Sequence, residues 1–191
     1  MREDVNELAQ SLLGKYLFSW VGDRLAGGMI TETEAYRGIH DRASHAYGGR
    51  RTGRTRVMFA EGGVAYVYLC YGIHALFNVV TNVEDVPDAI LVRGMVVTQG
   101  CSTMTMRLQR RVEKGSAVNG PGLVSRALGI TTAFSGIPLV RTRTRDAIWI
   151  EDRGVVVVPE CMAALPRIGV GYAGPDANLP YRYLWSIEKK S

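Results

Sequence analysis

The sequence predicts an α+β fold, a single domain over residues 1–191 with a curved, mostly antiparallel sheet and flanking helices. Stretches rich in Val, Ile, Leu and Tyr follow one another with few helical patterns between them, which favours antiparallel pairing of neighbouring strands. A hydrophobic content of 47% in 191 residues suffices for one well-buried core and is short for two domains. No linker or low-complexity segment divides the chain.

Three segments have helical patterns. Apolar residues recur at helical spacing over Val5–Leu13, which is followed by a glycine. A second helix is expected over about Thr103–Glu113. A third is expected over Gly120–Leu128, where Asn119 and the residues after it supply a cap and Pro121 suits the first turn.

The other apolar stretches predict strands, because they are short and rich in β-branched and aromatic residues. The expected strands cover Tyr16–Val21, Leu25–Tyr36, Ala65–Tyr71, Leu76–Thr81, Ala89–Val97, Ile148–Ile150, Val155–Val158 and Tyr181–Ser186.

Clustered arginines carry much of the positive charge, and a net charge of +5 suits a polyanionic partner. One cluster lies in a stretch too rich in Gly and Thr for a stable helix and predicts a basic loop: Arg50, Arg51, Arg54 and Arg56. A second is spaced as one stripe on the second helix: Arg107, Arg110, Arg111 and Lys114. A third alternates as on a strand face: Arg141, Arg143 and Arg145. Arginine-rich loops near a pocket favour phosphate contacts, because the planar fork grips phosphate oxygens in pairs.

The pair formed by Glu34 and Tyr36 is the strongest indication of chemistry. Alternate side chains of a strand share one face, so Glu32, Glu34 and Tyr36 point the same way, with about 7 Å between neighbours on that face. A carboxylate beside an aromatic ring is partly desolvated, which raises its pKa and suits a general base. The residues alone leave open an ordinary edge-strand glutamate next to a packed tyrosine.

Other chemistries find little support in the spacing of residues. The sequence contains neither a phosphate-binding loop motif nor a dinucleotide fingerprint. His40, Asp41 and His45 match no familiar zinc pattern, so neither a metal nor a cofactor is expected. Glu32 and Glu34 have a separation that would suit an inverting sugar hydrolase, but both leave one strand in the same direction and cannot flank a bond.

The cysteines and the N-terminus indicate a reduced, intracellular environment. Cys70, Cys101 and Cys161 are odd in number and form no Cys-x-x-Cys pair, so we expect reduced core thiols. Residues Met1–Leu8 are polar and acidic, where a signal peptide needs a basic start and an apolar run. No apolar run approaches the roughly 20 residues that span a bilayer, and no membrane contact is expected.

An ordered set of motifs resembles one family over nearly the whole chain, from about Leu8 through Tyr183. The motifs are Thr31–Tyr36, His45, Arg56–Phe59, Tyr66–Gly72, Asn78–Val80, Leu91–Arg93, Asn119–Gly122 and Arg167–Gly174. With these motifs the chain resembles the alkyladenine (3-methyladenine) DNA glycosylases of the type shared by bacteria and animals.

The resemblance implies a monofunctional DNA N-glycosylase of base excision repair. An alkylated or deaminated purine (3-methyladenine, 7-methylguanine, hypoxanthine or ethenoadenine) is flipped out of duplex DNA, and the base–deoxyribose bond is hydrolysed. By resemblance, Glu34 activates the attacking water and Arg93 helps to position it. No lysine matches an active-site position, so water is the expected nucleophile and the strand is not cut.

The same resemblance assigns the pocket. Tyr36 and His45 are expected to sandwich the flipped base, and Tyr68 to close the pocket. Such stacking tolerates many bases and strengthens for cationic ones. Asn78 would crowd out the exocyclic amine of normal guanine, although by itself it suggests a turn or strand-end asparagine. Tyr71 would fill the gap that the flipped base leaves in the stack.

Further DNA contacts are implied at six positions: Arg50, Thr52, Arg54, Met58, Ile73 and His74. Three positions depart from the family pattern. Gly53 and Thr55 stand where proline and asparagine are expected, which should loosen the basic loop. Leu123 stands where many members carry lysine, which removes a possible phosphate contact.

Two other functions remain open at this stage. The same surface suits a non-catalytic module that recognises flipped or single-stranded bases, although a pure reader has little use for Glu34 near a polyanion. A nucleoside hydrolase would need neither the arginine loop nor Tyr71. We expect a monomer whose partner is double-stranded DNA with damaged purines. Its expected location is cytoplasmic and nucleoid-associated in a bacterium, or nuclear in a eukaryote.

Overall fold

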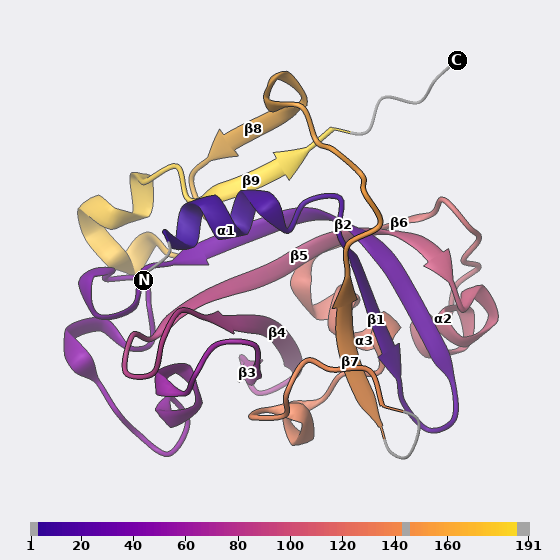
Figure 1. The fold of residues 1–191 in the computed structure, drawn as a ribbon, viewed down its shortest axis with the longest axis horizontal. Helices are drawn as coiled ribbons and strands as arrows, with labels where there is room; N and C mark the ends of the chain where they lie inside the picture. The colour runs from indigo at the N-terminus through magenta and orange to yellow at the C-terminus, as the bar shows by residue number, and fades with distance from the viewer. Residues whose placement is uncertain (1–3, 143–145, 187–191) are drawn as a thin grey trace.

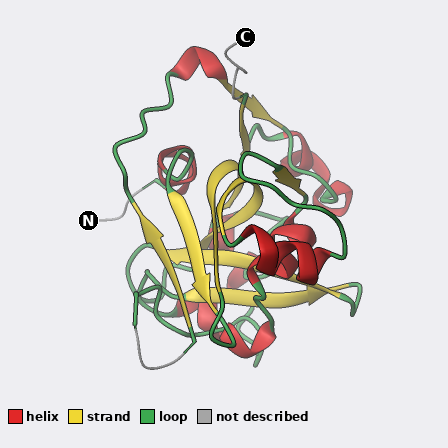
Figure 2. Cartoon of the chain, turned by 90° about the vertical axis from the view of Figure 1, so that its right-hand side faces the viewer, coloured by secondary structure: helices red, strands yellow, loops and turns green. Residues whose placement is uncertain are grey.

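A curled sheet with flanking helices forms the protein, as the sequence predicts. The computed structural model describes residues 4–142 and 146–186, and its nine strands form one sheet. The main path through the sheet is β3-β4-β5-β2-β1-β7, with β6 on β5, β9 on β2 and β8 on β9. All strand pairings among the described residues are antiparallel. Figure 2 shows the strands curling through the molecule with helical segments around them.

The sheet is built around two long strands. The nine strands are β1 Tyr16–Trp20, β2 Leu25–Tyr36, β3 Ala65–Cys70, β4 His74–Thr81, β5 Asp88–Gln99, β6 Ala117–Asn119, β7 Ala147–Glu151, β8 Met162–Leu165 and β9 Arg182–Trp185. β2 and β5, at twelve residues each, pair at the centre. Seven of the eight predicted strands are present with small shifts at their ends, and the short β6 and β8 are additional.

Three α-helices and several 3-10 turns surround the sheet in the described residues. The α-helices are α1 Val5–Ser11, α2 Cys101–Leu108 and α3 Pro121–Leu128. The 3-10 segments are η1 Gly38–His40, η2 Tyr47–Gly49, η3 Arg56–Phe59, η4 Thr132–Phe134, η5 Pro159–Cys161 and η6 Gly171–Asn178. In Figure 1, α1 lies across β2. The Thr33 hydroxyl of that strand donates to the Ala9 carbonyl of α1 over 2.8 Å.

The main core lies between the sheet and these helices. Apolar side chains from α1, α2 and α3 meet those of β2, β4 and β5 in one continuous cluster. Its largest members have no exposed surface: Ile30, Phe77, Ile90, Met95, Met104 and Leu128. Burial of this kind supplies most of the free energy that favours folding.

The second helix is shorter than predicted. α2 ends at Leu108 because Gln109 adopts a left-handed conformation with φ of +55°. Arg110, Arg111 and Lys114 therefore lie outside the helix, and the predicted basic stripe is wrong. Arg107 turns inward instead and donates to the backbone carbonyls of Ala127 and Val21 over 3.1 and 3.0 Å. The spacing of Arg107 in the sequence matched a surface stripe, but its guanidinium instead donates to backbone carbonyls of neighbouring segments.

Other local expectations also need correction. Val155–Val158 is extended but pairs with no described strand. Helix α3 begins with Pro121 as predicted, yet its cap is Gly120 and no side chain caps it. All three cysteines are free, as expected, but each is only partly buried and none is a core residue. Positions 143 and 145 of the third basic cluster lie outside the described residues. None of the described helices is long and apolar enough to cross a membrane.

Candidate active site

Glu34 lies near the end of β2 and is completely buried, with 0% of its surface exposed. Its Oε2 accepts a hydrogen bond of 2.8 Å from the Tyr36 hydroxyl. Its Oε1 accepts another of 2.8 Å from the Ile168 backbone N–H, and lies 3.3 Å from Nε of Arg93. The predicted pairing of Glu34 with Tyr36 on one strand face is thereby confirmed. Two hydrogen-bond donors and the Arg93 cation, from three segments, surround the carboxylate.

Arg93 owes its direction to irregular pairing between β2 and β5. The register shifts around Glu32, so that Arg93 has no pairing partner on β2. Such irregularities re-aim side chains and are frequent near active sites. Nε of Arg93 lies 3.1 Å from Glu32 and 3.3 Å from Glu34. Glu32 also accepts from Arg182 over 3.1 Å, so this second carboxylate anchors arginines.

The surroundings of Glu34 tune its basicity in opposite directions. Burial raises the pKa of Glu34 above its usual value, while the Arg93 charge, the Ile168 N–H and the Tyr36 hydroxyl oppose that rise. Burial and the neighbouring Glu34 raise the pKa of Tyr36 well above its usual value, so Tyr36 stays protonated and keeps donating. The result is a basic carboxylate that can still ionise, which suits a general base.

Aromatic side chains wall a pocket above this carboxylate. A cavity of about 30 Å³ is lined by Tyr36, Ala43, Ser44, His45, Met58, Tyr66, Tyr68, Asn78, Ala89 and Tyr172. Four of these also line a larger groove of about 890 Å³, which extends to Tyr71, His74, Arg93, Leu123 and Ile168. The structure thus brings together all the predicted pocket residues.

His45 is held in one tautomer at the pocket wall. Its ring lies edge-on to Tyr68, with centroids 4.6 Å apart. Nη2 of Arg54 lies 2.7 Å from Nε2, and the Tyr66 hydroxyl lies 2.9 Å from Nδ1. Arginine can only donate, so Nε2 accepts and Nδ1 carries the proton. Burial, followed by the charges of Arg54 and Arg50, lowers the pKa of His45 to about 4, so the ring is neutral at pH 7.

Asn78 and Met58 form deeper parts of the wall. Nδ2 of Asn78 donates to the carbonyls of Tyr66 and Leu76 over 3.1 and 3.3 Å, which fixes the amide. Met58 is only 2% exposed. The Met58 side chain lines the pocket and does not reach the outer surface, whereas the sequence predicted that it would contact DNA. The motif Arg56–Phe59 forms the turn η3, and this turn places the Met58 side chain in the pocket wall.

Tyr71 stands at the tip of the hairpin between β3 and β4. It is 89% exposed and has a φ of +51°, a conformation that L-residues other than Asn and Asp rarely adopt. The Ile73 N–H donates to the Cys70 carbonyl over 3.2 Å and closes the turn. Ile73 and His74 are also exposed. Three predicted DNA-surface residues therefore lie side by side next to the groove.

Hydrogen bonds within the basic loop centre on Thr55, one of its departures from the family pattern. The buried Thr55 hydroxyl donates to the Arg50 carbonyl over 2.9 Å and accepts from the Thr52 N–H over 2.8 Å. Thr55 therefore ties both sides of the loop together, and the predicted loosening stays a prediction. Arg50 and Thr52 are exposed. Arg54 reaches the pocket, where its guanidinium carbon lies 5.2 Å from the centroid of the Tyr68 ring.

Two residues of the site, Ile168 and Tyr172, were not assigned a role from the sequence. Ile168 supplies a donor to Glu34, and the Tyr172 hydroxyl donates to the Ala43 carbonyl over 3.0 Å at the pocket rim. Both belong to the motif Arg167–Gly174, which supported the resemblance without a role for any of its residues. Among the described residues no group of three His, Cys, Asp or Glu side chains could hold a metal ion.

Comparison with known proteins identifies the family. The methylpurine-DNA glycosylase family matches residues 1–189. The chain belongs to the methylpurine-DNA glycosylase family. This member is therefore a hydrolase, a DNA glycosylase that acts in base excision repair, and the resemblance stated from the motifs is confirmed.

Relatives of this methylpurine-DNA glycosylase family member occur in several bacteria. The chain is 42% identical over 192 residues to a protein of Chlamydia pneumoniae, covering 98% of this chain and 93% of the relative. It is 39% identical over 190 residues to a Chlamydia felis protein, with 99% and 94% covered. For a Bacillus subtilis protein the values are 40% over 177 residues, with 93% and 86% covered. Each relative is named "Putative 3-methyladenine DNA glycosylase".

Proposed function

We propose that the protein is a monofunctional glycosylase that excises alkylated and deaminated purines from duplex DNA with a water molecule activated by Glu34. The observation that carries this proposal is a fully buried carboxylate, held by two hydrogen bonds and an ion pair with Arg93, beside a pocket walled by aromatic rings. The names of the bacterial relatives support 3-methyladenine as one substrate. The proposed range also includes 7-methylguanine, hypoxanthine and ethenoadenine.

Binding begins with the removal of the damaged nucleotide from the stack. Tyr71 enters the gap, and the flipped base stacks on Tyr36, His45 and Tyr68. The same three rings also line the larger groove of about 890 Å³, through which the base enters. Stacking favours cationic alkylated bases through cation–π attraction, and Asn78 crowds the exocyclic amine of guanine.

Hydrolysis then needs one base and one water. Glu34 takes a proton from the water, whose oxygen forms the new bond to C1′ of deoxyribose. The C1′–N bond breaks, and its electron pair leaves with the purine. Arg93 orients the water from the side of β5 and keeps Glu34 ionised.

Water, rather than a lysine amine, serves as nucleophile. Among the lysines in the described part of the chain, Lys15 pairs with Asp152, and neither Lys15 nor Lys114 lines the pocket. Without a Schiff base the product is an abasic site in an uncut strand. One monomer per lesion suffices for this chemistry.

Incubation with duplex DNA that carries one damaged base tests the proposal. Base release and alkali-dependent strand scission are measured without added metal, with hypoxanthine, ethenoadenine and 7-methylguanine in separate duplexes. Glu34→Gln should lower the single-turnover rate by about 10²–10⁴-fold, the usual value of a general base. Glu113→Gln, which changes an exposed glutamate paired with Arg111, is the matched control. A Glu34→Gln protein with full activity would refute the mechanism, and tight binding by the wild type without base release would indicate a non-catalytic reader.

A further inference from the structure

Arg167 and Asp41 form an ion pair that is buried behind the aromatic pocket. The side chain of Arg167 has 0% exposure and that of Asp41 has 1%. Both nitrogens of the guanidinium fork reach the carboxylate, with Nη2 2.9 Å from Oδ1. A buried ion pair adds little net stability compared with apolar side chains of similar size. A pair in this position therefore calls for an explanation other than stability alone.

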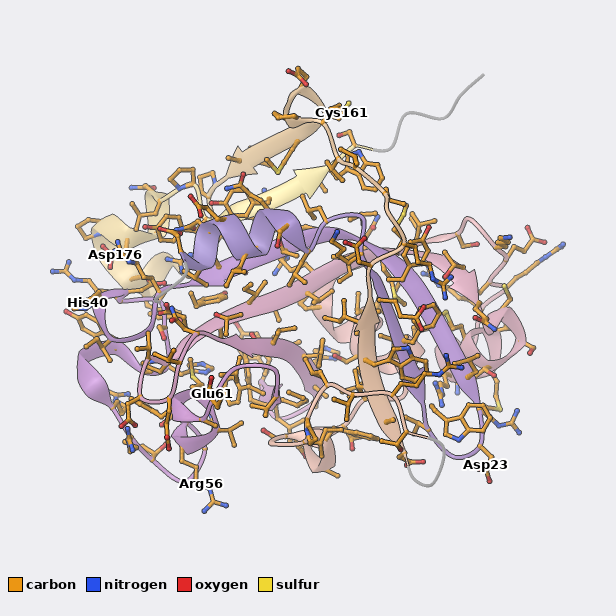
Figure 3. The ribbon with its side chains drawn as sticks, in the orientation of Figure 1. Asp23, His40, Arg56, Glu61, Cys161 and Asp176 are labelled. Carbon is orange, nitrogen blue, oxygen red and sulfur yellow. The ribbon has the colours of Figure 1, made fainter. Side chains whose placement is uncertain are left out.

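The pair joins three segments that carry site residues. Arg167 donates to the carbonyl of Ala35 in β2 over 2.9 Å and to that of Asp176 in η6 over 3.2 Å. Asp41 accepts from the backbone N–H groups of Arg37 and Ala43 over 3.1 and 2.9 Å, in the segment that leads to the pocket histidine. Figure 3 labels Asp176 and His40, which lie on the same side of the molecule.

Each segment that is tied in this way presents one component of the site. Ala35 stands between Glu34 and Tyr36 in the strand, so the bond to its carbonyl fixes the backbone between them. The guanidinium carbon of Arg167 lies 4.8 Å from the centroid of the Tyr36 ring and supports that ring. The residue after Arg167 is Ile168, whose N–H donates to Glu34.

We propose that Arg167, with Asp41, is a positioning residue that holds Tyr36 and the Ile168 N–H in the arrangement required by Glu34. The inference rests on the proposed function. Arg167 is not a catalytic residue, because it acts through the backbone and through the Tyr36 ring. The motif that begins at Arg167 thereby gains a role.

The positive charge of Arg167 adds a second effect. It opposes the rise that burial causes in the pKa of Glu34, after the stronger effects of Arg93, the Ile168 N–H and Tyr36. The charged and titratable groups around Glu34 are Glu32 and Tyr36 on β2, Arg93 on β5, Arg182 on β9, Tyr68 on β3, and the Arg167–Asp41 pair. Loss of Arg167 should therefore raise the pKa of Glu34, both directly and through a misplaced Ile168 N–H.

Arg167→Met tests the inference, because it removes the charge and the donors while keeping a long side chain. Single-turnover base release from a 7-methylguanine duplex is measured across the acid and neutral pH range, together with affinity for undamaged duplex. We expect a rate about 10–100-fold lower at neutral pH, typical of misplaced reacting groups. The acid limb of the rate profile should move to higher pH, and DNA affinity should stay within about twofold of wild type because the pair is buried away from the DNA surface. Asp41→Asn should have a similar effect, and the double variant should lose little more.

Arg107→Met is the matched control, since Arg107 also donates to two backbone carbonyls but lines neither the pocket nor the groove. It should lower thermal stability and leave the acid limb unchanged. A wild-type rate and acid limb in Arg167→Met, or an equal shift of the limb in Arg107→Met, would overturn the inference. Should Arg167→Met fail to fold, Arg167→Lys keeps the charge but lacks the fork, and a wild-type profile there overturns it equally.

The two proposals fail separately. A wild-type protein without base release, or a fully active Glu34→Gln variant, refutes the proposed function whatever Arg167 does. A protein whose activity depends on Glu34 but not on Arg167 refutes only the positioning role.

Discussion

Replacement of Tyr36 by phenylalanine tests how the site keeps Glu34 ionised. The change removes one hydroxyl, which donates to Glu34 over 2.8 Å, and keeps the ring. Glu34 has no exposed surface, so water does not readily replace the donor. A hydrogen bond to a charged group is worth about 1.5–3 kcal/mol, and one pKa unit corresponds to about 1.36 kcal/mol. The pKa of Glu34 should therefore rise by about 1–2 units.

The assay is the pH dependence of single-turnover base release. Under the proposed function Glu34 acts in its ionised form, so the rate should fall as the pH drops through the pKa of Glu34. In Tyr36→Phe this acid limb should move upward by about 1–2 units, while the rate on the alkaline side and the affinity for damaged duplex stay near wild type. Tyr36→Leu, which also removes the ring, should weaken binding of the damaged base. An unmoved acid limb in Tyr36→Phe would refute the role assigned to this hydrogen bond.

Three further outcomes follow from the geometry. Because the pKa of Glu34 is raised in the folded state, its ionisation opposes folding once the pH exceeds the unfolded-state pKa. Glu34→Gln should therefore raise the melting temperature at neutral pH, by an amount that shrinks as the pH falls. A lower melting temperature in Glu34→Gln at neutral pH would contradict this. Arg54→Gln removes a cation, so the pKa of His45 should rise from about 4 in an NMR titration; an unchanged pKa would show that the charge of Arg54 does not lower it. Tyr71→Ala should slow excision severalfold from duplex but little from single-stranded DNA, where no stack is opened; equal losses would exclude a wedge.

Strand periodicity predicted the centre of the site because it is a local property. Alternation along β2 places Glu34 and Tyr36 on one face, and their hydrogen bond confirms it. The aim of Arg93 depends on the register shift between β2 and β5, which alternation within one strand cannot reveal. Ile168 lies 134 residues from the carboxylate that it contacts, and only the tertiary fold brings the two together.

The features of helix and loop that the sequence did not predict have similar causes. The basic stripe expected beyond Arg107 failed because Gln109 turns left-handed and ends α2. In the basic loop, the Thr55 hydroxyl binds the backbone of Arg50 and Thr52, which the sequence did not predict. The first outcome depends on the backbone conformation of one residue and the second on where one hydroxyl points, and residue type alone determines neither.

The protonation states of the pocket residues affect which damaged bases leave fastest. His45 is neutral at pH 7, with its proton on Nδ1 directed at Tyr66, and the raised pKa of Tyr36 keeps that phenol a weak acid. A carboxylate at the same site favours the positive charge that develops on deoxyribose as the bond breaks. Under the proposed function Glu34 assists every base, but these pocket residues provide no strong acid for a neutral leaving group. Cationic purines then need no proton in order to leave, whereas hypoxanthine depends on a proton from solvent.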